Sequence, residues 1–446
     1  MLLTDAIMIG RLLGTDALAA ASVANTIFNF LWFFILGAST ALDTLASQSW
    51  GAGDSAGVVL WTATTGVVLT AVLVPCSIIL YFSNDISHAW MGQPEDIAAD
   101  VGTFNRMLIL GMPALVWSTA LQKALIARND VVTPTALCVI TAFLNVGLNL
   151  AFIPWLGFQG APIATTASRW VLFAFTAAYW YIRRAALFAG KLRWTVGNVL
   201  QLATSWRMVR AFSLIGIPGA LMLGLEAASF DLTTAFAARL GTVAVDAHTS
   251  MLNIVTFSFI SLPFGLAIAV SIRVGNLLGS GQPLRARLAG RLSICVGTAF
   301  MAVSAIIIVV CRQYLGAIFV DDQDVMALVA KIAPIAAAFE ICDGLQGTAA
   351  GVLRGLGKQH LLVVINIIGL WLIGMTAGVC LTFVADVGLA GLWWGLFAGL
   401  STTAAMSLFV LGRTNWAAES VKAIDRVEDH TSHRAGAAVV DATVAG

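Results

Sequence analysis

The sequence predicts an all-α polytopic membrane protein with twelve transmembrane helices, and its composition, segment lengths and internal repeat all indicate this fold. Of the 446 residues, 59% are hydrophobic and only 11% are charged. A soluble domain carries about 25% charged residues. Too few charges are present to cover a water-exposed surface, so lipid must cover much of the outside. The net charge of +1 gives no reason to expect a nucleic-acid partner.

Twelve apolar segments bounded by polar residues follow one another along the chain. Most of them reach the roughly 20 residues that a helix needs to cross a bilayer. They run over 1–12, 17–43, 57–82, 102–127, 132–154, 161–182, 208–237, 243–271, 287–311, 326–352, 360–384 and 388–412. The first segment is too short to span, so we expect an incomplete first helix. No basic region precedes it, unlike in a cleavable signal peptide.

Two polar stretches divide this pattern. We expect 183–207 to be a cytoplasmic linker between an N-lobe (1–182) and a C-lobe (208–412), and 413–446 to be a disordered cytoplasmic tail. Basic residues concentrate on alternate loops, with Arg354 counted among them, whereas the intervening loops carry few. The positive-inside rule then places the linker and the C-terminus in the cytoplasm.

The two sets of six segments resemble one another. Leu13-Gly14-Thr15 opens a segment that ends at Gly51-Ala52-Gly53, and Leu240-Gly241-Thr242 opens one that ends at Gly279-Ser280-Gly281. The offsets, 227 and 228 residues, agree to within one. An even number of helices in each half gives both halves the same orientation. Parallel repeats of this kind build transporters whose site lies between the halves.

Carboxylates inside the apolar segments are the clearest functional candidates, because one placed near the centre of a spanning helix costs at least about 2.5 kcal/mol. Glu226 and Asp231 lie five residues apart in the seventh segment. The rotation between them is about 140°, so they cannot share one narrow face. Glu340 and Asp343 lie three residues apart in the tenth segment and do share a face.

Two other carboxylates lie in the first two segments. Asp5 belongs to the incomplete first segment, and Asp43 ends the second. A packing role is favoured for Asp43, because helix ends offer donors and water. Arg169 and Lys331 are the obvious basic partners at matching depth. The six cysteines form no metal-binding pattern and are expected to be small buried residues.

A carboxylate removed from water favours a bound proton or cation. A proton and a cationic substrate therefore compete for the same negative site. If the protonated and the substrate-bound forms prefer opposite openings of the protein, a proton gradient drives the substrate in the other direction.

Three longer motifs are more specific. They occupy 40–51, 273–279 and 351–359, and read TALDTLASQSWG, RVGNLLG and GVLRGLGKQ. They resemble the ends of helices 2, 8 and 10 in multidrug and toxic compound extrusion (MATE) transporters, the eukaryotic branch most closely. Trp50 stands where the family usually has Tyr or Phe. The residues of these motifs that match the family pattern are Asp43, Gln48, Asn276, Arg354 and Gln359.

The resemblance implies two six-helix lobes arranged as a V, and export by rocking between outward- and inward-facing states. It places Glu226 and Asp231 at the two Glu positions of the eukaryotic E-W-W-x-x-E motif, with Ala227 and Ala228 in place of its two Trp. It places Asp343 at the acidic position of helix 10, whereas Glu340 has no counterpart.

For the N-lobe, the resemblance places Asp5 at the helix-1 Asp of DinF-like members, which serves there as a proton site. The usual helix-2 Asn falls on Phe28, with Asn25 and Asn29 beside it. The candidate cation and substrate ligands are therefore Glu226, Asp231, Asp343, Asp5, Glu340, Asn25 and Asn29.

The expected function is secondary antiport, exporting organic cations, xenobiotics or amphipathic metabolites in exchange for H⁺ or Na⁺. The alternatives are an organic-anion exporter, for citrate or phenolic conjugates, and a lipid-linked precursor flippase, which would need a basic cavity. No HExxH, nucleotide-binding loop, nucleophile elbow or metal cluster indicates an enzyme. We expect no catalytic residue, cofactor or metal, and a monomer in the plasma membrane or a vacuolar or other organellar membrane.

Overall fold

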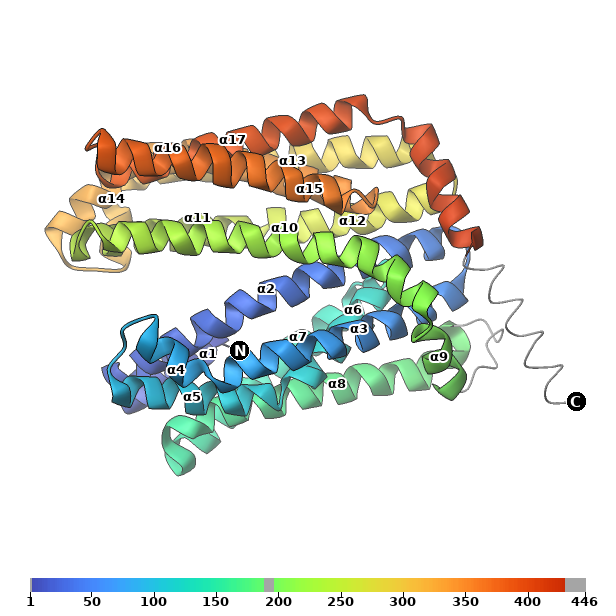
Figure 1. Ribbon diagram of the computed structural model, residues 1–446, viewed down its shortest axis with the longest axis horizontal. Helices are drawn as coiled ribbons and strands as arrows, with labels where there is room; N and C mark the ends of the chain where they lie inside the picture. Colours follow the sequence, from blue (N-terminus) through green and yellow to red (C-terminus); the bar gives the residue numbers. More distant parts are fainter. Residues whose placement is uncertain (1, 188–195, 430–446) are drawn as a thin grey trace, which may run out of the picture. The chain divides into compact units, whose positions relative to one another are not determined.

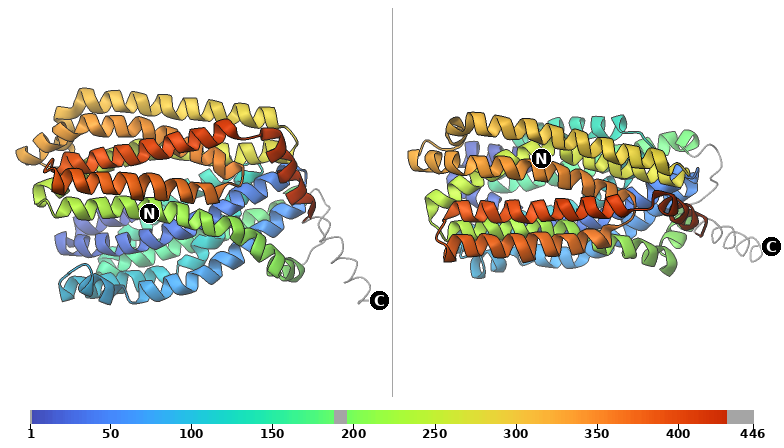
Figure 2. Two further views of the ribbon diagram at one scale, coloured as in Figure 1. Left: turned by 45° about the horizontal axis from the view of Figure 1, so that its top comes forward. Right: turned by 90° about the horizontal axis from the view of Figure 1, so that it is seen from above.

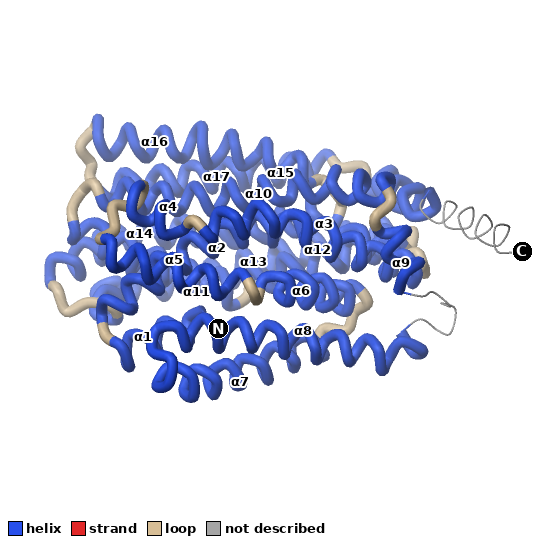
Figure 3. The backbone as a smooth tube through the Cα atoms, turned by 60° about the horizontal axis from the view of Figure 1, so that its bottom comes forward, coloured by secondary structure: helices blue, strands red, loops and turns tan. Residues whose placement is uncertain are grey.

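The computed structural model describes residues 2–187 and 196–429, and every regular element in these ranges is a helix (Figure 3). In the first half of the chain the helices are α1 (Leu2–Leu13), α2 (Thr15–Gly51), α3 (Ser55–Tyr81), α4 (Ser83–Ala89), α5 (Glu95–Ile109), α6 (Met112–Ala127), α7 (Val132–Leu156), η1 (Gly157–Gln159), α8 (Gly160–Leu187) and α9 (Val196–Ala203).

The second half continues with α10 (Trp206–Ala238), α11 (Thr242–Ser261), α12 (Pro263–Gly279), α13 (Pro283–Leu315), η2 (Gly316–Ile318), α14 (Gln323–Gly355), α15 (Gln359–Asn366), η3 (Ile367–Met375), α16 (Thr376–Val379), η4 (Cys380–Val384) and α17 (Leu389–Arg413). The segments η3 and η4 are π-helical, so α15 to η4 form one rod with a locally widened backbone.

The twelve predicted segments each correspond to a helix or to consecutive helices. In the described ranges nine helices are long and apolar enough to cross a membrane, or ten when the pair α5–α6, bent by 49°, is one span. One of the nine, Val132–Arg183, is 52 residues long and contains both α7 and α8. The other difference from twelve is α1, whose 12 residues are too few to span.

The chain folds into two compact units. Unit 1 comprises Met1–Leu42 and Asp54–Leu214, and unit 2 comprises Asp43–Gly53 and Ile215–Gly446. The sequence placed the whole of the second segment in the N-lobe, whereas the structure assigns the last residues of α2 to unit 2. The first residues of α10 likewise belong to unit 1.

In unit 1, α8 packs against α5, α6 and α7, and α1 lies against α7 and α8. The turn between α7 and α8 is tight because Gly157 has a φ of +60° and Gly160 lies directly against the Phe152 backbone. The short helix α9 lies beside α3 (Figure 1). These contacts hold α1 in place although it cannot span a bilayer alone.

In unit 2, α14 is the central helix and contacts α11, α12, α13 and α17. The rod α15–η4 and α17 run side by side (Figure 1). Their backbones touch at glycines, because a Cβ added at Gly395 would lie 2.4 Å from the Cα of Gly378. Small residues of this kind let membrane helices approach closely.

The internal repeat is visible in the backbone. Gly14 and Gly241 open equivalent helices with φ of +94° and +106°, and Gly53 and Gly281 follow their ends with φ of +79° and +70°. The backbone hydrogen bonds that close these two helix ends also correspond to each other, at positions 228 residues apart. The repeats differ in one respect. The helix α2 is continuous, whereas its counterpart breaks before Pro263 into α11 and α12, since proline disrupts helical hydrogen bonding.

The equivalent helix ends cross each other inside unit 2. A Cβ on Gly51 would lie 2.0 Å from the carbonyl oxygen of Asn276, and one on Gly279 would lie 2.1 Å from that of Gln48. Gly51 and Gly279 are equivalent in the repeat, as are Gln48 and Asn276. The contact is therefore reciprocal, and glycine is required on both sides.

The prediction of a disordered tail over 413–446 is wrong for 416–429, which form a helix after α17 (Figure 2). This helix buries Ala423, and its Ser420 hydroxyl donates to the Leu278 carbonyl. Glu419 pairs with Lys358 at 3.2 Å. A short helix that could not fold alone is thus stabilised by docking. Residues 430–446, and 188–195 of the predicted linker, lie outside the described residues.

The prediction that the cysteines are buried is wrong for three of the six, and two more are half-buried. Cys76 is buried, whereas Cys138, Cys295 and Cys380 are exposed on helix surfaces. A thiol behaves as a small apolar group, so a helix face that contacts lipid can carry it.

Candidate functional site

Charged side chains from three helices form a continuous series inside unit 2. Asp343, in the middle of α14, interacts electrostatically with Glu226 of α10, and Glu340, one turn earlier in α14, interacts with Asp343. Arg354, in the last turn of α14, attracts both Glu226 and Asp43. The series therefore runs Glu340, Asp343, Glu226, Arg354, Asp43, and its guanidinium acts on Glu226 and Asp43.

These groups are largely removed from solvent. Glu340 is 0% exposed, Asp343 9%, Arg354 6% and Asp43 2%, and Glu226 is half-buried. Burying a charge is costly unless it is paired and hydrogen-bonded. With all groups ionised the site would carry excess negative charge in a poorly solvated environment. It is therefore arranged to accept protons or another cation.

Glycines on α14 bring the neighbouring helices close to this series. A Cβ on Gly351 would lie 2.4 Å from the Ala267 carbonyl oxygen of α12, and one on Gly355 would lie 2.5 Å from that of Ser271. Gly344 approaches α13 in the same way. The spacing of these glycines gives α14 a small-residue face, so α14 becomes the most enclosed helix of unit 2.

The rod α15–η4 supports the turn of α10 that carries Glu226. The Asn366 amide donates to the Met222 carbonyl at 3.0 Å and also interacts with the Glu226 carboxylate. The indole of Trp371 donates to the Leu225 carbonyl at 3.1 Å. Trp371 thus brings an aromatic ring next to the Glu226 turn, where α10 itself has only alanines.

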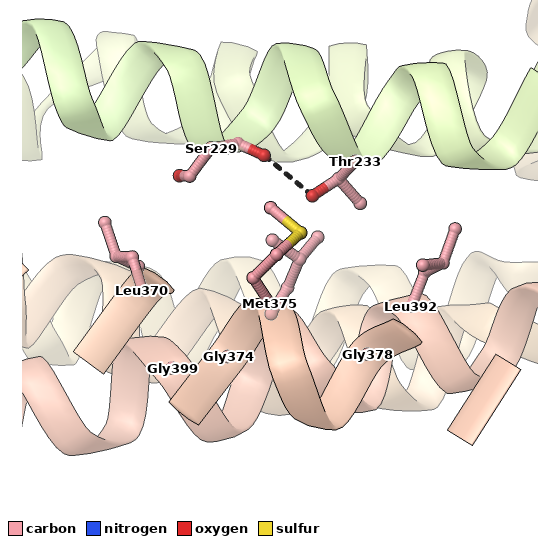
Figure 4. A pocket seen from close by; sticks show the side chains of 9 residues that line it. Ser229, Thr233, Leu370, Gly374, Met375, Gly378, Leu392 and Gly399 are labelled. Atoms are coloured by element: carbon pink, nitrogen blue, oxygen red, sulfur yellow. Dashed lines mark hydrogen bonds between the residues drawn. The ribbon is translucent and has the colours of Figure 1, made fainter. Parts of the chain in front are cut away.

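A narrow pocket lies one turn further along α10, where Ser229, Thr233 and Met375 face one another (Figure 4). Its floor is formed by glycines of the rod and of α17. The Ser229 hydroxyl donates to the Glu226 carbonyl at 2.7 Å, so the pocket and the carboxylate share one stretch of helix. The pocket has room for about one water molecule. It is too small for an organic substrate.

Unit 1 contains a separate acidic site. Asp5 is 0% exposed, and its two carboxylate oxygens accept hydrogen bonds from the Asn149 amide and the Thr165 hydroxyl. The Asn145 amide donates to the same Thr165 hydroxyl. Arg169, one turn further along α8, is the positive neighbour of Asp5. This carboxylate therefore has its donors and its counter-charge within unit 1.

A comparison with known families identifies the fold. The family model MatE matches residues 1–151 and 218–379, well over half of the chain. This chain is a member of the MATE transporter family. It is accordingly an integral membrane transporter of the multidrug and toxin extrusion type, and not an enzyme.

The relatives of this MATE protein come from several kingdoms. Protein DETOXIFICATION 16 of Arabidopsis thaliana is 32% identical, over 94% of this chain and 85% of that protein. Multidrug and toxin extrusion protein 1 of Oryctolagus cuniculus is 27% identical, over 90% and 69%. The crystal structure of the eukaryotic MATE transporter AtDTX14 superposes with a TM-score of 0.87 at 25% identity, over 96% of this chain and 94% of that one.

The motif residues of this MATE transporter gather at the end of α14. The Thr44 hydroxyl donates to the Arg354 carbonyl at 2.6 Å and the Gln48 amide donates to the Gly355 carbonyl at 3.2 Å. The Gln359 amide donates to Thr44 at 2.9 Å. The last carbonyls of a helix have no partner within it. Side chains from α2 therefore cap α14, and these motif residues serve packing.

Asp231 does not join the series around Glu226. Its side chain is exposed, on a different side of α10. This agrees with the predicted rotation between the two positions. The structure therefore separates two residues that the resemblance had placed in one motif.

Two predictions about basic residues need correction. Lys331 is exposed near the start of α14, and among the described residues no hydrogen bond or ion pair joins it to the carboxylates. Arg354, counted among loop residues in the sequence, is instead the buried partner of Glu226 and Asp43. The sequence could not show this, because the end of α2 covers the end of α14 from 310 positions away in the chain.

The predicted asparagines of the second helix lie near the unit 1 site without contacting Asp5. Asn25 and Asn29 are half-buried, and Phe28 between them lies under the Arg169 guanidinium, 4.6 Å from its ring centre. The side chains that do hydrogen-bond to Asp5 are those of Asn149 and Thr165. Sequence reasoning missed them, although two Asn four residues apart in an apolar segment are a usable signal.

Outside the membrane spans, the docked C-terminal helix contributes one more basic group. Arg426 donates to the Gln48 side-chain oxygen and lies beside Gly357. Burial lowers the pKa of Arg426 from its ordinary value, and Glu419 partly offsets this. Within the described ranges, no three His, Cys, Asp or Glu side chains come together as metal ligands.

Proposed function

We propose that this MATE transporter is a secondary antiporter that exports organic cations and amphipathic metabolites in exchange for H⁺, with Na⁺ as the second candidate coupling ion. The observation that carries the proposal is the excess of negative charge in unit 2. Arg354 acts on Glu226 and Asp43, whereas no basic group among the described residues acts on Asp343 or Glu340, so the site attracts positive charge. An organic anion would be repelled from it.

In the proposed cycle, protons and the substrate compete for Asp343 and Glu226. Poor solvation favours the protonated carboxyl groups when no substrate is bound. A substrate cation favours the ionised groups and releases the protons. If each form prefers a different opening, the exchange is coupled, because a ligand shifts an equilibrium only by its difference in affinity for the two states.

The other residues have supporting roles in this proposal. Arg354 supplies an opposite charge to Glu226, whereas Asp343 interacts with Glu226 itself. The two acidic residues are therefore not equivalent. Trp371 places an aromatic ring beside the turn that carries Glu226, and such a ring can make a cation–π contact with a substrate.

The test compares Glu226→Gln and Asp343→Asn with the native protein in reconstituted vesicles. We expect each change to abolish efflux of labelled tetraethylammonium driven by a pH gradient, at least a tenfold loss, while the protein still reaches the membrane. Asp425→Asn, on the exposed face of the docked C-terminal helix, is the control and should transport normally. Normal efflux by both acidic-site variants contradicts the proposal.

The coupling ion is identified in the same vesicles. Efflux under an imposed pH gradient is measured with and without sodium. Proton coupling predicts efflux that follows the pH gradient regardless of sodium. Efflux that requires a sodium gradient instead would assign the exchange to Na⁺.

A second candidate substrate class is organic anions, such as citrate or phenolic conjugates. One observation favours it. The Nη1 atom of Arg169 is buried and has no hydrogen-bond partner among the described residues, so it could bind a carboxylate. Uptake of labelled citrate in place of tetraethylammonium is the result that would favour this class. A lipid-linked precursor flippase, which needs a basic cavity, has no comparable support.

The remaining proposals concern assembly and orientation. We propose that the protein is a monomer. We also propose that its C-terminus lies in the cytoplasm, because basic residues concentrate on the linker and the tail side of the chain. The plasma membrane and vacuolar or other organellar membranes fit equally. Labelling of a cysteine placed at the chain end, in sealed vesicles, tests the orientation.

A further inference from the structure

Glu340 is the carboxylate whose environment differs most from those of its neighbours. It is 0% exposed, and neither of its oxygens has a hydrogen-bond partner among the described residues. Each of the other acidic residues in the series has a basic or amide neighbour, or lies next to an acidic residue that has such a neighbour. An ionised carboxylate in such a place would keep its full desolvation cost.

The groups around Glu340 supply no positive charge. Asp343, on the same face of α14, is the charged residue that acts on it. On α11, His248 contacts Thr234 and the Trp393 ring of α17, which packs on Phe339. The arginines of α12 and α13 are all exposed: Arg273, Arg285, Arg287, Arg291 and Arg312. Two adjacent carboxylates without a counter-ion cannot both be ionised.

We propose that Glu340 is a third cation-binding carboxylate of the exchange site, and that it carries a proton that is exchanged together with the proton of Asp343. This rests on the proposed antiport. When the substrate cation reaches Asp343 and Glu226, its positive charge is the counter-charge that Glu340 lacks, and the proton on Glu340 passes to solvent. The number of protons released per bound substrate molecule is then one higher than the number that Asp343 and Glu226 alone would release.

The experiment counts the protons released when tetraethylammonium binds to the purified full chain. Calorimetry in buffers of different ionisation enthalpy gives this number. We expect Glu340→Gln to bind tetraethylammonium and to release one proton fewer than the native protein. Glu340→Asp should restore the native number, and Glu419→Gln, on the docked C-terminal helix, should not change it. An unchanged number in Glu340→Gln overturns the proposal.

The structure also predicts how stable the variants are. Because Glu340 makes no hydrogen bond among the described residues, replacing it removes a desolvation cost and no partner. Glu340→Gln and Glu340→Met should therefore unfold at the same temperature as the native protein or higher. A lower unfolding temperature in both would show that Glu340 is a packing residue, and this also overturns the proposal.

Failure of the proposed antiport gives a different result. If the native protein binds tetraethylammonium and releases no proton, proton antiport itself is wrong. If the native protein releases protons and Glu340→Gln releases the same number, proton antiport stands and only the role of Glu340 is wrong.

Discussion

The two units bury their carboxylates in different ways. In unit 1, both oxygens of Asp5 accept hydrogen bonds from Asn149 and Thr165, and Arg169 balances the charge. In unit 2, Arg354 acts on Glu226 and Asp43, whereas Asp343 has no basic neighbour and Glu340 has no hydrogen-bond donor among the described residues. Unit 1 thus satisfies its acid with its own side chains, whereas unit 2 needs additional positive charge. Under the proposed function, the same type of residue serves packing in unit 1 and exchange in unit 2.

The largest expected effect on stability comes from removing the only guanidinium of the unit 2 series. Arg354→Met removes the buried positive charge that acts on Asp43 and Glu226. Breaking a buried pair in this way costs about 3–5 kcal/mol. We expect a matching drop in thermal stability in detergent, followed by loss of the folded protein on size exclusion. Arg413→Met, an exposed position at the end of α17, is the control. Equal behaviour of the two variants would show that the series does not depend on Arg354.

The next effect tests whether the end of α2 belongs to the unit 2 series. Gly51→Ala places a methyl group within 2.0 Å of the Asn276 carbonyl oxygen. Overpacking of this kind costs about 1–3 kcal/mol, and it would move Asp43 away from Arg354. Gly265→Ala is the matched control, because its Cβ meets nothing within 4 Å and alanine is favoured in helices. Thermal unfolding distinguishes them, and a stable Gly51→Ala would disprove the close crossing.

The smallest effect concerns unit 1. A double-mutant cycle of Asp5→Asn and Arg169→Met should give a coupling energy of about 1 kcal/mol, within the range for interacting residues. Because Asp5 is already satisfied, Asp5→Asn should lower stability and still transport under a pH gradient. Loss of efflux as complete as in Asp343→Asn would instead make unit 1 a coupling site and remove the contrast between the units.

Much of the fold could be predicted from the sequence, because lipid imposes long apolar segments that are easy to recognise. The segment containing Glu340 and Asp343 and their common face followed from helical spacing alone. The tail could not be read in this way. Its 416–429 helix is held by contacts such as that of Ser420 with Leu278, and contacts between distant positions leave no periodic signal.

The partners of the buried acids were harder to predict for a similar reason. Arg354 resembles a loop arginine in sequence, because it ends an apolar segment in a basic stretch. Its burial depends on α2 side chains that cap α14. Asn366 and Trp371 reach the Glu226 turn from another helix. Spacing along one helix predicts which residues share a face, but it does not predict what a second helix brings to that face.

The reciprocal crossing of Gly51 and Gly279 has the symmetry of a homodimer contact. In a two-fold symmetric dimer, residue i of one copy meets residue j of the other, and j meets i. Here Gly51 meets Asn276 and Gly279 meets Gln48, within a single chain. Each repeat therefore carries a self-complementary patch. A six-helix half produced alone would expose that patch, and two such halves could join through it as the fused repeats do.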